Sequence, residues 1–214
     1  MARASVIAVF PSFTRHFEGY CLAPYRDVEG WPTVAAGNLA SPISVWRSLP
    51  WVIDGRPATA DEIDRDWTSL HSAPFGLKYA AGYFAPYTKV RLTVPGADKV
   101  VDDRLQLNDR ELAARLSPGR WEELPARAQL ALHSWAWADG PEGHAPHLWA
   151  AVEAGDWTTA ANEVHLEDSH NPGLVPRNAA NKALLLACLA SDNDDDAGWS
   201  DGAVTTPATP AAPF

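Results

Sequence analysis

Residues 18–37 read EGYCLAPYRDVEGWPTVAAG, and this stretch carries the strongest chemical signal in the 214-residue chain. Glu18 is followed nine residues later by Asp27, and Asp27 is followed six residues later by Thr33. Cleavage of a glycosidic bond needs an acid that protonates the leaving oxygen. It also needs a carboxylate that activates a water or attacks the sugar directly. Glu18 and Asp27 are of the right residue types for these two roles.

The segment before Glu18 predicts a helix, because apolar residues recur every three or four positions, at Ile7, Phe10, Phe13 and Phe17. Proline is tolerated better in the first turn of a helix than in its interior. We therefore expect the ordered helix to begin near Pro11. Glycine commonly ends helices, so Gly19 places Glu18 at the helix C-terminus.

The two carboxyl groups are expected to have different surroundings. Burial beside Phe17 and Tyr20, together with the negative end of the helix dipole, would favour the protonated Glu18 that an acid catalyst requires. Asp27 opens the turn DVEG and is expected to stay solvated and ionised. Thr33 offers a hydroxyl that could hold a water. Taken singly, these residues also fit a helix end, an acidic turn and a strand.

The spacing of several residues resembles the signature of phage-type (T-even phage endolysin-like) lysozymes, which reads E-G-x-x-L-x-x-Y-x-D-x-x-G-x-x-T-x-G-x-G-H. The chain matches it without a gap at Glu18, Gly19, Leu22, Tyr25, Asp27, Gly30, Thr33 and Gly37. Later segments resemble the family in the same order, at residues 59–67, 124–140, 151–164 and 173–185. Residues 73–120 match poorly and indicate an enlarged region.

The resemblance implies an α+β, mainly α-helical, lysozyme-like fold with a small β-rich lobe and a larger helical lobe. One domain is expected over residues 1–190. Its small lobe would cover about residues 20–58, its enlarged region about 73–120 and its helical lobe about 121–190. Residues 191–214 are rich in Asp, Ala, Pro and Thr, without Lys or Arg, and predict a disordered tail.

The resemblance also implies residue roles. Glu18 would be the general acid, Asp27 would position or deprotonate the attacking water, and Thr33 would help to hold it, with inversion at the sugar. Tyr25, Asn38 and Arg177 would bind substrate, with Arg177 supporting the surroundings of the acid. The substrate would be the bond between N-acetylmuramic acid and N-acetylglucosamine in peptidoglycan, and no cofactor would be needed.

Two positions depart from the family pattern. Ala35 stands where the family has glycine, so the strand geometry there is expected to change. Asn38 stands where the family has histidine, and it can still donate and accept hydrogen bonds. These departures favour an alternative: a lysozyme fold with weak or no turnover that binds peptidoglycan as a structural or docking module. A second alternative keeps the enzyme but changes its substrate to a chitin-type polymer.

Composition excludes several other classes. A net charge of −10 argues against a nucleic-acid partner, because phosphate contacts need a basic face. The two cysteines, Cys21 and Cys188, are too few for a disulfide framework, and we expect two free, buried thiols, although a single pairing stays open. The histidines lack metal-ligand spacing. No apolar run is long enough for a membrane span.

The biological setting stays open between a phage endolysin and a secreted antibacterial effector. Without a signal peptide, the chain would be made in the cytoplasm and act in the periplasm or on the cell wall after release or delivery. The acidic body slightly favours the effector. An effector would have an inhibitor or immunity protein, or a secretion component, as a further partner.

The rest of the chain predicts mostly helices. Residues 40–58 hold Pro42, Pro50 and Pro57 and predict a loop. Thr59 and Glu62 form a capping box, and Asn108 with Glu111 marks another helix start. Residues 89–94 predict a short strand or extended segment. Further helices are expected from Pro125 to Asp139 and over residues 146–154, 156–166 and 176–190.

Overall fold

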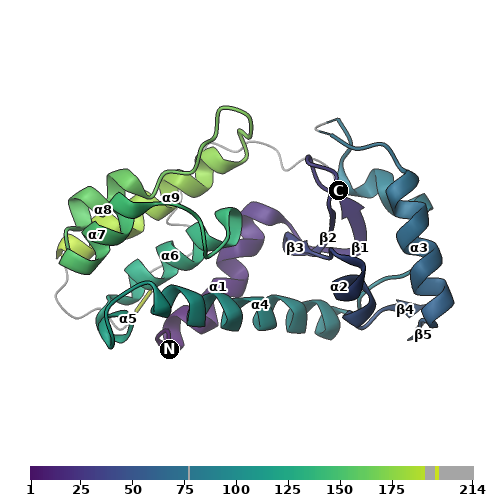
Figure 1. Ribbon diagram of the computed structural model, residues 1–214, viewed down its shortest axis with the longest axis horizontal. Helices are drawn as coiled ribbons and strands as arrows, with labels where there is room; N and C mark the ends of the chain where they lie inside the picture. The colour runs from purple at the N-terminus through teal and green to yellow at the C-terminus, as the bar shows by residue number, and fades with distance from the viewer. Residues whose placement is uncertain (77, 191–195, 198–214) are drawn as a thin grey trace. The chain divides into compact units, whose positions relative to one another are not determined.

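The computed structural model describes residues 1–76, 78–190, 196 and 197. It divides into two compact units, one formed by residues 1–17 with the described residues from 105 onward, and one formed by residues 18–104. Of the tail predicted for residues 191–214, all but Asp196 and Ala197 lies outside the described residues. The fold is α+β and mainly helical, as predicted (Figure 1).

The unit of residues 18–104 is built around a three-stranded antiparallel sheet in the order β1-β2-β3. These strands are β1 (Cys21–Arg26), β2 (Pro32–Ala35) and β3 (Asn38–Leu39). Tyr25 of β1 pairs with Thr33 of β2, and Thr33 pairs with Leu39 of β3. The hairpin between β1 and β2 therefore brings the Asp27 turn next to Thr33, as its DVEG turn predicted.

Residues 40–58, predicted to be a loop, contain a helix and a small hairpin instead. Helix α2 spans Ile43–Ser48, and strands β4 (Val52–Ile53) and β5 (Arg56–Pro57) pair with each other. The prediction was wrong because Pro42 is the N-cap of α2 and Pro50 follows its end, so these prolines bound the helix rather than exclude it. Buried Trp46 fixes α2 by donating to the Ile63 carbonyl.

Helix α3 (Ala60–Ser72) begins at the predicted capping box, with Thr59 as its N-cap. A short 3-10 helix, η1 (Ala81–Tyr87), follows. Arg91 then forms an isolated bridge with Val52, which is all the strand character that residues 89–94 show. Helix α4 runs without a break over Val94–Ala114, so Asn108 lies inside it and is not the predicted helix start.

The other unit is almost entirely helical. Helix α1 spans Ala4–Glu18 and starts before Pro11, which lies in its interior. The predicted start was wrong because Val6, Phe10 and Phe13 bury one helix face on both sides of the proline. Each buried phenylalanine is worth about 1.5–3 kcal/mol, which offsets the roughly 3 kcal/mol cost of an interior proline.

The remaining helices of this unit largely follow the predictions. They are α5 (Arg120–Glu123), α6 (Ala126–Asp139), α7 (Pro146–Ala154), α8 (Trp157–Glu163), α9 (Leu174–Ala187) and the 3-10 helix η2 (Cys188–Ala190). Helix α6 is buried along nearly its whole length and packs against α9, which also contacts α8. Among the described helices, none is long and apolar enough to cross a membrane.

Candidate active site

Glu18 is the last residue of α1, as predicted, and Gly19 after it adopts the left-handed conformation with φ 72°. The half-buried Glu18 side chain lies against Gly37, which also has a positive φ of 71°. A Cβ atom placed on Gly37 would lie 2.5 Å from Oε2 of Glu18. Glycine is therefore needed at position 37 both for its backbone conformation and for the space that the Glu18 carboxyl occupies.

Asp27 is held by hydrogen bonds within its own turn. Its Oδ1 accepts the backbone N–H groups of Glu29, at 3.0 Å, and Trp31, at 2.8 Å. The Asp27 carbonyl accepts the N–H of Gly30 at 3.0 Å, and the Asp27 N–H donates to the Trp31 carbonyl at 3.0 Å. This Asx-turn pattern fixes the Oδ1 oxygen of Asp27. The Oδ2 oxygen takes no part in it and can contact groups outside the turn.

Thr33 lies next to that second oxygen. The buried Thr33 hydroxyl is 3.4 Å from Oδ2 of Asp27 and 3.1 Å from the Trp31 carbonyl. A hydroxyl has one proton to donate and two lone pairs to accept with. Thr33 can therefore orient Asp27 and still accept a hydrogen bond from a water or a substrate hydroxyl.

Tyr25 lies on β1, two residues before Asp27. Burial raises the pKa of the Tyr25 phenol well above its usual value, and the charges of Glu18, Cys21 and Asp27 raise it further. The phenol is therefore neutral at neutral pH and remains a hydrogen-bond donor.

Ala35, at the end of β2, has φ 54°, in the left-handed region that favours glycine. Its partner across the sheet is Cys21, and a β-bulge lies between Cys21 and Tyr25 on that strand. Cys21 is half-buried and Cys188 is buried, and both are free thiols. Alanine thus holds a left-handed backbone conformation here, at a cost of about 1–2 kcal/mol.

Asn38 is turned towards α4. Its buried amide Nδ2 donates to the Val100 carbonyl at 3.3 Å, while its buried Oδ1 has no hydrogen-bond partner among the described residues. One turn further along α4, Arg104 donates to the Gly37 carbonyl at 2.9 Å. Val100 and Arg104 therefore support the β2–β3 turn against which Glu18 lies.

The sequence did not single out Arg104 as part of this site. It falls in the poorly matched residues 73–120, where no local motif indicates that an arginine will meet a carbonyl far away in the chain. The apolar periodicity of α4 gave part of the information needed to place Arg104. Val101 and Leu105 are both buried. Their spacing therefore predicts that Arg104 lies next to the apolar face of the helix.

Arg177 lies in the other unit, on α9. It is buried, donates to the Ser134 carbonyl at 3.0 Å and stands 5.2 Å above the ring of Phe17. The structure therefore gathers Glu18, Tyr25, Asp27 and Thr33 in the unit of residues 18–104. Arg177 belongs to the helical unit.

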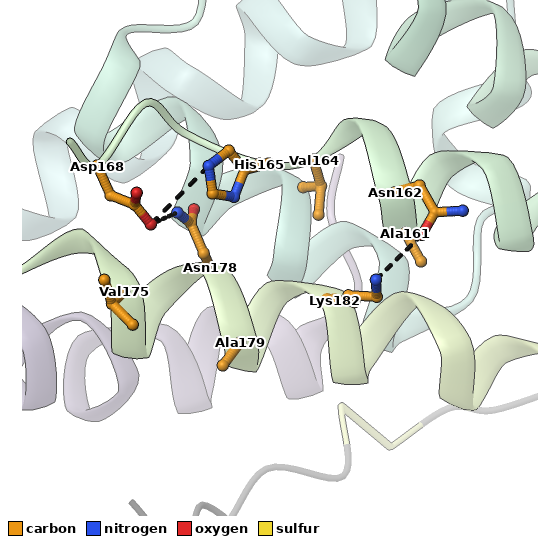
Figure 2. Close-up of a pocket in the computed structure, with 9 residues that line it drawn as sticks. All are labelled: Ala161, Asn162, Val164, His165, Asp168, Val175, Asn178, Ala179 and Lys182. Carbon is orange, nitrogen blue, oxygen red and sulfur yellow. Dashed lines mark hydrogen bonds and ion pairs between the residues drawn. The ribbon is translucent and has the colours of Figure 1, made fainter.

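A separate cavity of about 320 Å³ lies in the helical unit, between α8, α9 and the segment after α8 (Figure 2). Asn178 donates to Asp168 at 3.1 Å and to the Leu166 carbonyl at 2.8 Å, and His165 approaches Asp168 at 3.8 Å. These contacts tie the segment after α8 to α9. The described residues contain no group of His, Cys, Asp and Glu able to hold a metal ion.

Comparison with known proteins finds similarity among solved structures. No protein-family model and no curated protein matches the chain. Among solved structures, a mutant of P22 lysozyme matches with a TM-score of 0.52 and 15% sequence identity, over 87% of this chain and 99% of that one. At this identity the likeness concerns the fold alone, and the fold of this chain is lysozyme-like.

Proposed function

We propose that the chain is a peptidoglycan hydrolase, a muramidase that cleaves the β-1,4 bond between N-acetylmuramic acid and N-acetylglucosamine. The observation that carries the proposal is the hairpin that joins Asp27 to Thr33, in the same unit as Glu18 and within a lysozyme-like fold. Of the motif that resembles phage-type lysozymes, the three residues with proposed catalytic roles, Glu18, Asp27 and Thr33, are all present.

Glu18 would act as the general acid that protonates the leaving glycosidic oxygen. Its half-buried carboxyl at the end of α1 is held in place by Gly37 on one side. A fixed carboxyl favours proton transfer, because the distance to the leaving oxygen decides how well the proton is delivered. Arg104 maintains this arrangement through the Gly37 carbonyl.

Asp27 and Thr33 would hold and activate the attacking water. Oδ1 of Asp27 is occupied by two backbone N–H groups, so Oδ2 is the oxygen that would accept a proton from the water. The Thr33 hydroxyl next to Oδ2 would be a second contact for the same water. Attack by a water held in this way, on the face opposite Glu18, would invert the sugar.

The three candidate binding residues would have separate tasks. Tyr25, neutral and close to both carboxylates, would donate a hydrogen bond to the sugar. Asn38 and Arg177 would act indirectly, since Asn38 faces α4 and Arg177 stacks on Phe17, the residue before Glu18. We propose no cofactor, because acid–base chemistry by these carboxyls is sufficient for hydrolysis.

A phage endolysin of the T-even type and a secreted antibacterial effector are both consistent with this activity. In either case the chain would act in the periplasm or on the cell wall. An effector would additionally require an inhibitor or immunity protein in the producing cell. Periplasmic expression that is toxic without this protein and harmless with it would support the effector, whereas harmless periplasmic expression of folded protein would contradict it.

Product analysis tests the proposed bond. Purified protein is incubated with purified cell walls, and the released fragments are analysed by mass spectrometry after borohydride reduction. The expected products are muropeptides whose reduced end is N-acetylmuramic acid. Fragments ending in reduced N-acetylglucosamine would contradict a muramidase. Faster release from chitin oligomers than from cell walls would assign the enzyme to chitin-type polymers instead.

The alternative of a glycan-binding module with weak turnover rests on two observations. Ala35 adopts a glycine-type conformation at a cost in free energy, and Asn38 is turned to α4 where the family has histidine. In the same experiment, cell-wall binding without fragment release by folded protein would support this alternative and contradict the enzyme.

A further inference from the structure

A long segment of this acidic chain carries only positive charge. Residues 67–97 contain Lys78, Lys89 and Arg91 and neither Asp nor Glu, although the whole chain has a net charge of −10. Lys78 and Lys89 are exposed and have no acidic partner among the described residues. Exposed lysines without an acidic partner can attract anionic ligands even where the net charge of the chain is negative.

The same segment carries three neighbouring tyrosines whose rings are tilted against one another. The ring centroids of Tyr79 and Tyr83 are 4.6 Å apart, and those of Tyr83 and Tyr87 are 5.8 Å apart, with interplanar angles of 40° and 38°. The Tyr83 and Tyr87 hydroxyls are 3.3 Å apart, and the Lys78 ammonium stands 5.0 Å above the Tyr79 ring. Tyr83 is 41% exposed. We call Lys78, Tyr79, Tyr83 and Tyr87 the tyrosine surface.

Contacts on the inner side anchor Tyr83 and the residues that follow it. Phe84 is fully buried and contacts Tyr83 edge-on, with ring centroids 5.4 Å apart. Arg91 donates to the carbonyls of Ala85 and Thr88. The buried carboxylate of Asp66 accepts the next two backbone N–H groups, from Lys89 and Val90. An aromatic side chain that is already anchored by such contacts loses less conformational entropy when a ligand binds to it.

The tyrosine surface lies in the same unit as the candidate residues Glu18, Asp27 and Thr33. Helix η1, which carries Tyr83 and Tyr87, packs on β1, the strand that leads to Asp27 (Figure 1). Phe75, 48% exposed, lies under the guanidinium of Arg26 at 4.3 Å and contacts Gly30 in the Asp27 turn. Trp31, 55% exposed, follows in the same turn. Exposed aromatic rings thus occur both beside Asp27 and in the segment that packs on β1.

We propose that the tyrosine surface binds the peptidoglycan strand outside the catalytic residues, with sugar rings against Tyr79 and Tyr83 and the carboxylates of the muramyl substituents near Lys78. This inference rests on the proposed function for the identity of the glycan. The apolar faces of sugar rings pack on aromatic rings, and tyrosine adds a hydroxyl for hydrogen bonds. Peptidoglycan offers both the rings and the negative charge that this surface complements.

Binding to insoluble cell walls tests the surface without requiring turnover. The measurement is co-sedimentation with purified cell walls, performed in a Glu18→Gln background so that the wall stays intact. Tyr83→Ala is expected to raise the apparent Kd about three- to tenfold, and Tyr83→Trp is expected to retain binding. Lys78→Ala is expected to weaken binding at low salt and to have little effect at high salt.

Leu107→Ala is the matched control, because Leu107 is 45% exposed and lies in the helical unit. Unchanged wall binding of Tyr83→Ala, with circular dichroism showing a folded protein, would overturn the inference. The inference would also be overturned if the wild type were a dimer and Tyr83→Ala a monomer with unchanged wall binding, because the surface would then join two copies of the chain. If wall binding depends on Tyr83 but the wild type releases no muropeptides, the tyrosine surface is supported and only the proposed muramidase activity is contradicted.

Discussion

At the scale of single residues, the contact between Glu18 and Gly37 determines where the proposed acid lies. The Gly37→Ala substitution would place a methyl group where the Glu18 carboxyl lies and would strain a backbone with φ 71°. We expect a loss of about 1–2 kcal/mol in the free energy of unfolding and a roughly 10- to 100-fold loss of cell-wall hydrolysis through displacement of the carboxyl.

Gly55→Ala separates these two effects. Gly55 has a similar φ of 80°, but a Cβ atom there would meet nothing within 4 Å. It should therefore show the same loss of stability in thermal denaturation and retain hydrolysis. Equal hydrolysis by the two variants would show that Gly37 does not position Glu18.

Which residues meet in the site was predictable only where the chain itself joins them. A two-strand hairpin around the DVEG turn places Thr33 beside Asp27, and a glycine after Glu18 ends the helix there. The contacts of Asn38 with Val100 and of Arg104 with Gly37 depend on how α4 packs, which no local pattern encodes. The positive φ of Ala35 could not be predicted either, because alanine at a position does not indicate a left-handed backbone.

At the scale of elements, the capping box of α3 is predicted to be worth about 1 kcal/mol. The Thr59 hydroxyl accepts the Glu62 N–H at 3.4 Å, and the Glu62 carboxylate accepts the Thr59 N–H at 2.9 Å. Hydrogen bonds from Arg56 and Thr59 also hold the pKa of Glu62 well below its usual value. Thr59→Ala should lower the thermal midpoint, whereas Thr68→Ala, exposed within the same helix, should leave it nearly unchanged. Equal midpoints would contradict the cap.

Elements were predicted best where local signals and packing agree. The helices around Ala126–Asp139 and on both sides of Gly155 follow from apolar periodicity and from glycine at a helix end. Proline misled the prediction twice. At Pro11 the burial of one helix face compensates for an interior proline, and Pro42 caps the start of α2 instead of excluding a helix. Asn108 misled it too, because a residue type common at helix starts lies buried inside α4.

At the scale of the whole molecule, a buried histidine predicts how stability depends on pH. His133 is completely buried between Phe10 and Trp121, and burial lowers its pKa although Asp109 lies 3.4 Å away. Burial by itself would raise the pKa of Asp109, but His133, the Trp121 indole and the Ala2 N–H outweigh it and lower that pKa.

The folded protein therefore holds a neutral His133, while the unfolded chain takes up a proton near pH 6.5. The free energy of unfolding should be largest above that pH and fall as the pH drops towards the lowered pKa, by up to about 1.4 kcal/mol per pH unit. Loss of the charge on Asp109 should lower stability further at more acidic pH. Urea denaturation between pH 5 and 8 measures this slope.

His133→Gln should flatten the slope between pH 6.5 and 5.5, even if it lowers stability at pH 8. His147→Gln, at an exposed position of α7, should leave the slope as in the wild type. A His133→Gln protein with the wild-type slope would mean that other groups are responsible for the acid sensitivity.

The proposed function depends most on Glu18 as the acid that would protonate the leaving oxygen during cleavage of peptidoglycan. The most direct measurement compares muropeptide release by the wild type, Glu18→Gln and Glu29→Gln, where Glu29 is an exposed carboxyl in the Asp27 turn. We expect a loss of about 100-fold or more for Glu18→Gln and a rate within about twofold of the wild type for Glu29→Gln. Undiminished release by a folded Glu18→Gln protein would contradict the proposed role of Glu18.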